Sequence, residues 1–171
     1  MNKIQIIVNN GAGTGSAVAV WKETKEYLQE NEISYNAYLT RYEKHAVKLA
    51  GQICGKIPEG PIYLLVVGGD GTINEVLNGI TDFDRVRLGV IPTGSGNDFA
   101  RNLGILRNTR EDLREITACI GQEQNGEKLQ RIDLGKVSWE GCEKPRIFGI
   151  SAGAGLDAIV CKKALHSKLK K

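Results

Sequence analysis

The sequence has few of the features that define several classes of small protein. Its 4 cysteines, Cys54, Cys119, Cys142 and Cys161, are too far apart to form a Cys-x-x-Cys metal or redox pair. The longest aliphatic and aromatic run, Ile62–Val67, has six residues, whereas a membrane-spanning helix needs about 20. The N-terminus lacks the apolar stretch of a signal peptide. We therefore expect a reduced, cytoplasmic protein rather than a disulfide-stapled, secreted or membrane-spanning one.

Proline and charge of one sign are also scarce. Proline occupies only 4 of 171 positions and hydrophobic residues make up 41%, a composition that predicts a folded core. The formal net charge is +3, but the segment Lys162–Lys171 contains five lysines and no acid, and removing those five charges from +3 leaves −2. The body of the protein is therefore not a basic nucleic-acid binder.

The lysine-rich end allows two interpretations. The lysines lie beside one helical stripe of apolar residues, which comprises Leu156, Ile159, Val160, Ala164, Leu165 and Leu169. One interpretation is a weak, salt-dependent contact that makes the protein peripheral to the inner face of an anionic membrane. The other, which we favour, is that the stripe packs on further parts of a second domain while the lysines are solvated. Exposed edges of an incomplete domain would also allow a homo-oligomer.

Glycine, in contrast, is in excess. It accounts for 21 of 171 residues, without the repeat of a collagen. Three glycine-containing loops each follow an apolar stretch, at Asn9–Gly15, Gly68–Thr72 and Pro92–Asn97. Because glycine has no Cβ, such loops can turn sharply and can bring the backbone close to a ligand. The function is therefore expected in these loops.

Strand-like and helical segments alternate along most of the chain. Strand patterns cover residues 4–8, 33–39, 62–67 and 88–91, and helical patterns cover 17–28, 46–54, 73–80 and 109–120. The alternation predicts an α/β fold, with a Rossmann-like parallel sheet and helices on both faces, over residues 1–127. From residue 128, two strand-like segments flank a Glu140–Gly141 turn. They predict the beginning of an incomplete antiparallel β-rich domain, 128–171, with a basic C-terminal helix.

The most informative loop is Gly68–Thr72. Open parallel sheets bind ligands at the carboxyl ends of their strands, where all three glycine loops are expected. The glycines let the backbone approach an anion, and the following helix offers unpaired N–H groups and a favourable dipole, so the loop predicts phosphate binding. The Asp70 carboxylate would repel a polyphosphate unless a divalent cation or a transferable proton lies between them, which indicates a nucleotide with Mg²⁺. The simpler alternative is a glycine turn in which Asp70 merely caps the helix.

Two motifs make the sequence recognisable. The chain closely resembles the diacylglycerol kinase catalytic-domain family, in its bacterial lipid-kinase form, in Gly68-Gly69-Asp70-Gly71-Thr72-Ile73-Asn74-Glu75 and in Pro92-Thr93-Gly94-Ser95-Gly96-Asn97-Asp98-Phe99-Ala100-Arg101. Other segments agree in order: Asn9–Gly13 resembles the family's first nucleotide loop, and Thr40 with His45 resembles its second. Asp133–Gly135 resembles the junction between the two domains, and Gly153–Ala158 the start of the second.

The resemblance implies a Mg²⁺-dependent transferase that moves the γ-phosphoryl group of ATP to a lipid hydroxyl at the membrane surface. The nucleotide would lie between a Rossmann-like domain, 1–127, and a β-sandwich domain that begins at 128. It would be held by Asn9, Asn10, Gly11, Ala12, Gly13, Thr40, Gly68, Gly69, Asp70, Gly71, Thr72, Ile73, Asn74 and Ser95. Asp70 would be catalytic, and Asp70, Asp98 and Asp133 would organise Mg²⁺ and water. Asn10 stands where the family usually has proline, and Thr93 and Ser95 vary common choices while keeping a hydroxyl.

The resemblance leaves alternatives open. Family members continue well beyond this length, and carry there an Asp-Gly-Glu type motif that accepts the proton of the lipid hydroxyl; this sequence lacks it. We therefore expect the 171-residue chain alone to be inactive toward lipid, although it carries the nucleotide-binding half. A NAD kinase-like enzyme would share the Gly68–Thr72 pattern but not the second motif. A nucleotide-binding module without catalysis is the third interpretation.

Overall fold

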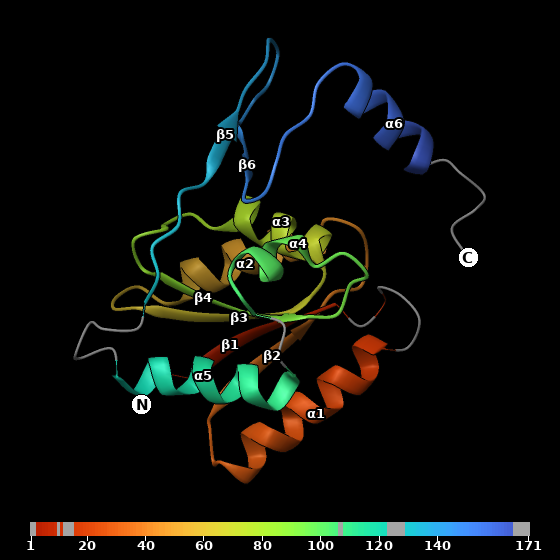
Figure 1. Ribbon diagram of the computed structural model, residues 1–171. Coiled ribbons are helices and arrows are strands. Elements are labelled where there is room, and N and C mark those ends of the chain that lie inside the picture. Colours follow the sequence, from red (N-terminus) through yellow and green to blue (C-terminus); the bar gives the residue numbers. More distant parts are fainter. Residues whose placement is uncertain (1–2, 10, 12–15, 106–107, 123–128, 166–171) are drawn as a thin grey trace.

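A computed structural model describes residues 3–9, 11, 16–105, 108–122 and 129–165, with the side chains of 121–122 and 164–165 left aside (Figure 1). The first part of the chain forms a four-stranded sheet from β1 (Ile4–Val8), β2 (Tyr35–Leu39), β3 (Ile62–Gly68) and β4 (Val86–Pro92). The strand order is β2-β1-β3-β4, and every neighbouring pair is parallel. The predicted α/β fold with a parallel sheet is therefore confirmed.

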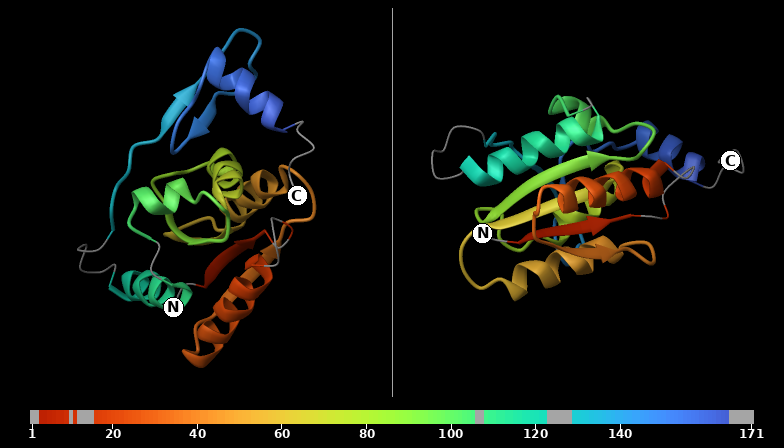
Figure 2. Two further views of the ribbon diagram at one scale, coloured as in Figure 1. Left: turned by 45° about the vertical axis from the view of Figure 1, so that its right-hand side comes forward. Right: turned by 90° about the horizontal axis from the view of Figure 1, so that it is seen from below.

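Helices cover both faces of this sheet. They are α1 (Ser16–Glu30), α2 (His45–Lys56), α3 (Asp70–Gly79), α4 (Asp98–Asn102) and α5 (Thr109–Gln122). Helices α1 and α5 lie side by side on one face, and α2, α3 and α4 lie on the other (Figures 1 and 2). Within β1, Ile7 belongs to the core under α2 and α3, whereas Ile6 and Val8 belong to the core under α1 and α5. This double coverage explains why β3 begins with a continuous apolar run, and why β1 is apolar except for the buried Gln5, rather than alternating.

The third helix begins earlier than its apolar pattern predicts. The sequence places the helix at 73–80 after a loop, whereas α3 starts at Asp70 inside the glycine motif. Gly69, in an extended conformation at the N-cap, leads directly from β3 into the first turn, and Asp70 supplies the acid that favours a helix N-terminus. The glycine motif is therefore partly the start of a helix. Its N–H groups point out of the carboxyl end of the sheet.

The later part of the chain forms a smaller unit beside α3 and α4. It consists of β5 (Gly135–Val137) and β6 (Arg146–Phe148), which pair antiparallel as predicted, and of α6 (Leu156–Leu165). The Asn78 side chain of α3 holds β6: its Nδ2 donates to Ile147 O at 2.8 Å and its Oδ1 accepts from Ile147 N at 2.9 Å. Gly149, directly after β6, lies against Phe99 of α4: a Cβ added at Gly149 would lie 2.6 Å from the Phe99 ring.

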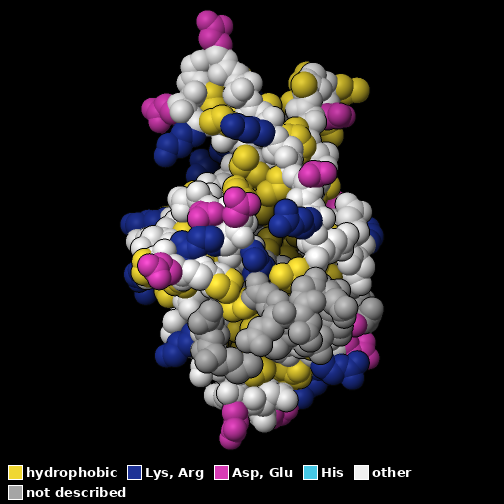
Figure 3. Space-filling model, turned by 90° about the vertical axis from the view of Figure 1, so that its left-hand side faces the viewer, with side chains coloured by type: hydrophobic (Ala, Val, Ile, Leu, Met, Phe, Trp, Pro, Cys, Tyr) yellow, Lys and Arg dark blue, Asp and Glu magenta, His cyan; other side chains and the backbone are white. Residues whose placement is uncertain are grey.

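Much apolar surface is exposed in this smaller unit. Figure 3 shows hydrophobic side chains on the surface of the upper part of the molecule, where Figure 1 places β5, β6 and α6. Among the large hydrophobic residues, Trp139 is 58% exposed and Leu156 is 74% exposed, and Ile159 and Val160 are also exposed. Within the described ranges, no helix combines the length and hydrophobicity that crossing a membrane requires.

Candidate functional site

The sheet order creates a crevice between β1 and β3. From β1 the chain continues through α1 to β2 on one side, and from β3 it continues through α3 to β4 on the other. Loops after these two neighbouring strands therefore diverge, which is the place where open α/β sheets bind ligands. Asn9, directly after β1, bridges the crevice: its Nδ2 donates to Thr72 Oγ1 at 2.8 Å. The first and second glycine loops thus meet at this point.

The start of α3 offers N–H groups to an anion. Gly69 occupies the N-cap with φ −92° and ψ −177°, and a glycine brings no side-chain cap to the first turn. Gly71, in that turn, is exposed, and apart from its chain neighbours and the backbone of its own helix no described residue lies within 4 Å of the place where its Cβ would be. A helix of 10 residues also directs the positive end of its dipole here. The arrangement suits a phosphate group.

The later residues of this motif are buried. Thr72 is 5% exposed, and its hydroxyl is engaged by Asn9. A Cβ at Gly68 would lie 2.8 Å from Thr72 Cβ, so the first glycine is needed for Thr72 to pack. Ile73 is 1% exposed within the core, and its amide donates to Gly69 O at 3.1 Å. Asn74 is half-buried and accepts a hydrogen bond at its carbonyl oxygen from Asn78.

The Asp70 carboxylate makes an unexpected pair of contacts. Its Oδ2 accepts a hydrogen bond from the Asp98 amide at 3.0 Å, and its Oδ1 accepts one from the Phe99 amide at 3.0 Å. One interpretation of the sequence was that Asp70 merely caps the helix that follows it. In the structure, the carboxylate instead caps α4, which begins within the second motif. The two signature motifs therefore meet through the side chain of Asp70.

Two of the three predicted metal-binding acids lie near each other. A Cβ placed at Gly96 would be 3.3 Å from Asp70 Oδ2 and 3.8 Å from Asp98 Oδ2, so both carboxylates border the same space. Asp98 also lies 3.5 Å from the Arg101 guanidinium, and both side chains are exposed. Asp133 is exposed in the connection before β5. Among the described residues, there is no group of three or more His, Cys, Asp or Glu side chains that could hold a metal ion.

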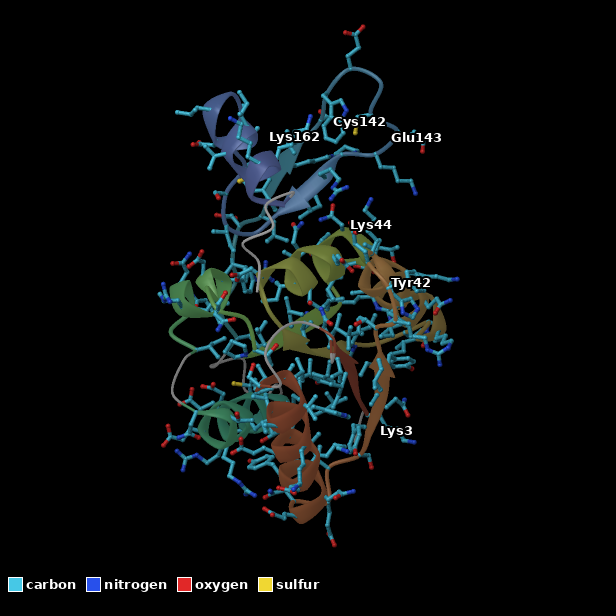
Figure 4. The ribbon with its side chains drawn as sticks, turned by 90° about the vertical axis from the view of Figure 1, so that its right-hand side faces the viewer. Lys3, Tyr42, Lys44, Cys142, Glu143 and Lys162 are labelled. Atoms are coloured by element: carbon cyan, nitrogen blue, oxygen red, sulfur yellow. The ribbon has the colours of Figure 1, made fainter. Side chains whose placement is uncertain are left out.

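The remaining predicted residues that the structure describes, Gly11, Thr40 and Ser95, lie at the same end of the sheet. Thr40 follows β2, and its amide donates to Val8 O at 2.9 Å; Gly11 donates its amide to Asn9 Oδ1 at 3.2 Å. Ser95 is exposed in the loop after β4. Asn10, Ala12 and Gly13 lie outside the described residues. Figure 4 shows Tyr42 and Lys44 in the connection after β2, away from Lys3 at the amino end of β1.

Two residues of the second motif take parts that sequence reasoning missed. Asn97 has a left-handed backbone, with φ 53°, and its side chain bonds both backbone polar groups of Gly94. The signal for it was an asparagine after glycine, since asparagine tolerates this conformation better than other non-glycine residues. Thr93 is 8% exposed, and its Oγ1 has no hydrogen-bond partner among the described residues. No sequence pattern distinguishes that hydroxyl from an ordinary buried one.

Comparison with known proteins identifies relatives of this chain. Residues 3–137 match the family model described as "Diacylglycerol kinase catalytic domain". The chain is 30% identical over 168 residues to YtlR of Bacillus subtilis (strain 168), which is named as a lipid kinase; the match covers 96% of this chain and 52% of YtlR. It is 58% identical over 76 residues to the diacylglycerol kinase of Staphylococcus carnosus (strain TM300), covering 44% of this chain and 22% of that protein.

The solved structures agree. A crystal structure of a diacylglycerol kinase from Bacillus anthracis str. Sterne matches with a TM-score of 0.56 and 29% identity, over 68% of this chain and 39% of that one. The chain thus spans about half the length of YtlR and less of the other two proteins. The family model extends from the start of β1 to the end of β5, and so includes all three glycine loops. The chain therefore belongs to the diacylglycerol kinase catalytic-domain family.

Proposed function

We propose that this chain carries the nucleotide-binding half of an ATP-dependent lipid kinase, and that it binds ATP with Mg²⁺ at the carboxyl edge of the parallel sheet. The observation that supports this most strongly is that the Gly68–Thr72 loop contacts both of the other glycine-containing loops. Asn9 reaches Thr72 across the β1–β3 crevice, and Asp70 reaches the start of α4. Loops gathered in this way at a strand switch point are typical of nucleotide sites.

The phosphates of ATP are proposed to lie at the start of α3. The exposed Gly71 leaves room for a phosphate oxygen near the first-turn amides, and exposed Ser95 on the neighbouring loop would donate its hydroxyl. The buried Thr93 hydroxyl supports a polar ligand, because an unsatisfied buried hydroxyl costs about 1–3 kcal/mol that a ligand oxygen would recover. Asn9, Gly11 and Thr40 would border the nucleotide on the side of β1 and β2.

Asp70 and Asp98 are the residues proposed to hold Mg²⁺. Both carboxylates border the space at Gly96. Each Asp70 oxygen accepts one hydrogen bond from a backbone amide and keeps a second lone pair for a further ligand. Oxygen ligands from one or two carboxylates, together with phosphate oxygens, are what Mg²⁺ prefers. When bound, the ion would neutralise charge on the phosphates. Asp133 is proposed as a further, more distant acidic group of the same site.

In phosphoryl transfer, the protein mainly positions the reacting groups and stabilises the charge of the transition state. In this chain, the backbone N–H groups at Gly69–Thr72 would fix the phosphates, and the loop at Gly94–Gly96 would hold them from the opposite side. The acceptor would be a lipid hydroxyl at a membrane surface, reached as a peripheral protein. A base must accept the proton of that hydroxyl. The Asp-Gly-Glu motif that would supply the base is not in this sequence. Transfer is therefore proposed for the longer form that the relatives represent.

Titration calorimetry tests the proposed binding. We expect the 171-residue chain to bind ATP, and Mg²⁺ to strengthen that binding. NAD in place of ATP is the control for a NAD kinase-like enzyme, and we expect it to give no saturable heat. The absence of saturable ATP binding at millimolar concentration, with the protein folded, would contradict the proposal.

A nucleotide-binding module without catalysis is the second candidate. The observation that favours it is that the described residues contain no group of three or more His, Cys, Asp or Glu side chains that could hold a metal ion. Transfer of labelled phosphate to diacylglycerol vesicles separates the two. Binding of ATP without transfer by a chain extended to the length of YtlR would favour the second candidate.

A further inference from the structure

A residue of the first signature motif caps the helix that follows the second. The Asp70 carboxylate accepts hydrogen bonds from the amides of Asp98 and Phe99, both at 3.0 Å. These amides belong to the first turn of α4, where they lack an intrahelical partner. Asn97 occupies the N-cap position, yet its side chain makes no capping bond to α4. The cap is therefore supplied from the other loop, by a group 28 and 29 positions earlier in the chain.

The Asn97 side chain is used for a different purpose. Its Nδ2 donates to Gly94 O at 2.7 Å, and its Oδ1 accepts from Gly94 N at 2.8 Å. Both polar atoms of the Asn97 side-chain amide therefore have partners within one short loop. The backbone of Asn97 is left-handed, with φ 53° and ψ 39°, and turns the chain so that the side chain reaches back to Gly94. Ser95 lies inside the closed segment. The loop shape is consequently fixed by Asn97, and its attachment to its neighbour by Asp70.

The two loops also touch through their backbones. The Thr93 amide donates to Gly68 O at 3.2 Å. A Cβ at Gly69 would lie 3.1 Å from Gly94 Cα, and one at Gly94 would lie 3.0 Å from Gly69 Cα. The two glycines therefore lie so close together that neither position has room for a side-chain carbon. The loops are therefore held together by the Asp70 carboxylate and by the backbone hydrogen bond between Thr93 and Gly68, with two glycines where they approach most closely.

We propose that Asp70 and Asn97 are positioning residues for the nucleotide, which hold the Thr93–Asn97 loop against the Gly68–Thr72 loop before the nucleotide arrives. We call this attachment of the Thr93–Asn97 loop to the Gly68–Thr72 loop by Asp70 and Asn97 the clamp. Its effect on nucleotide affinity rests on the proposed function, whereas the clamp itself does not. A site whose two walls are already ordered spends less free energy on ordering when the ligand binds. The clamp gives Asp70 a role that operates without a metal ion, in addition to any contact with Mg²⁺.

This role and simple metal ligation differ in what Asp70→Asn should do. If Asp70 acted only through Mg²⁺, the variant would bind metal-free ATP at least as well as the wild type does, because it removes a carboxylate that repels the phosphates. In the clamp, the substitution replaces one acceptor oxygen with an NH₂ group that would face a backbone N–H. One capping bond is then lost, and the second loop loosens whether Mg²⁺ is present or not.

The first measurement requires neither a variant nor a ligand. In isotopically labelled wild-type protein, the amide nitrogens of Asp98 and Phe99 should show scalar coupling through the hydrogen bonds to the Asp70 carboxyl carbon. Both amides should also exchange with solvent more slowly than the exposed amide of Gly96. Missing couplings together with fast exchange at both amides would overturn the clamp, whatever the protein binds.

The second measurement is ATP affinity in EDTA and in Mg²⁺. Asp84→Asn is the matched control, since it removes the same charge at an exposed site in the turn before β4. We expect Asp70→Asn to weaken ATP binding about tenfold or more in both buffers, and Asp84→Asn to leave it unchanged. If Asp70→Asn loses only the Mg²⁺-dependent part, the inference is wrong. If wild-type protein binds no ATP, the proposed function fails and the couplings still decide the clamp.

A second variant protects the test against misfolding. Asn97→Gly keeps access to the left-handed backbone but removes both bonds to Gly94, so it loosens the same loop from within. We expect it to weaken metal-free ATP binding, and to do so less in the Asp70→Asn background than in the wild type, because both act on one clamp. Circular dichroism checks each fold. Wild-type affinity of Asn97→Gly in EDTA, or strictly additive effects, would contradict the proposal.

Discussion

Replacement of Gly69 by alanine measures how closely the two glycine loops approach each other. Gly69 has φ −92° and ψ −177°, an extended conformation that alanine adopts without strain, so the substitution adds only the volume of a methyl group. That methyl would lie 3.1 Å from Gly94 Cα and 3.5 Å from Gly94 N. Since carbon atoms pack at about 3.5–4.0 Å, one loop must move by about 0.5 Å.

This displacement sets the expected magnitude. A movement of about 0.5 Å would stretch the 3.0 Å bonds that Asp70 accepts to about 3.5 Å, where hydrogen bonds become weak. Overpacking of this kind costs about 1–3 kcal/mol. At the lower limit we expect Tm to fall by about 2–4 °C for a protein of this size, and ATP affinity to fall about tenfold. Gly69→Val adds two further carbon atoms and should abolish ATP binding.

Gly55→Ala is the matched control. Gly55 is an exposed position within α2, and apart from its chain neighbours and the backbone of its own helix no described residue lies within 4 Å of the methyl that alanine would add. The control should therefore raise stability by about 0.5–1 kcal/mol through helix propensity and leave nucleotide binding unchanged. Thermal unfolding and titration calorimetry on both variants give the comparison. Wild-type Tm and wild-type ATP affinity in Gly69→Ala would refute the close contact between the loops.

Three further predictions concern other parts of the molecule. Asn78→Ala removes both bonds to Ile147, and we expect the Ile147 amide to exchange at least tenfold faster while the parallel sheet keeps its protection. The hydrogen bond from Arg110 lowers the pKa of Glu30, so their pair contributes stability above the ordinary glutamate pKa and loses it as pH falls through the lowered value. Arg110→Ala should therefore lower Tm slightly at neutral pH, and the difference should vanish in acid and in high salt. Finally, the 171-residue chain should transfer little labelled phosphate to diacylglycerol, and robust transfer would refute the need for a further base.

The layer structure could be predicted from the sequence, because it depends on local periodicity. Two largely apolar segments, 4–8 with Gln5 as its one polar residue and 62–67, are separated by helical patterns and specify strands buried on both faces; β1 and β3 occupy these positions. Helix boundaries were less accessible. The predicted start at residue 73 follows the apolar stripe, whereas α3 begins at Asp70 because glycine and a first-turn acid favour a helix start before any apolar contact is made.

The glycine motifs predict a phosphate site and the acids that belong to it, because residue types limit what a loop can bind. The partners of each side chain could not be read in the same way. Asp70 contacts α4 only because β3 and β4 are neighbours in the sheet, and Asn9 reaches Thr72 only because β1 lies on the other side of β3. Contacts between residues so far apart in sequence depend on strand order, which local patterns do not encode. The sequence by itself therefore determined which residue types the loops contain, and the tertiary structure alone decided that Asp70 joins two of them.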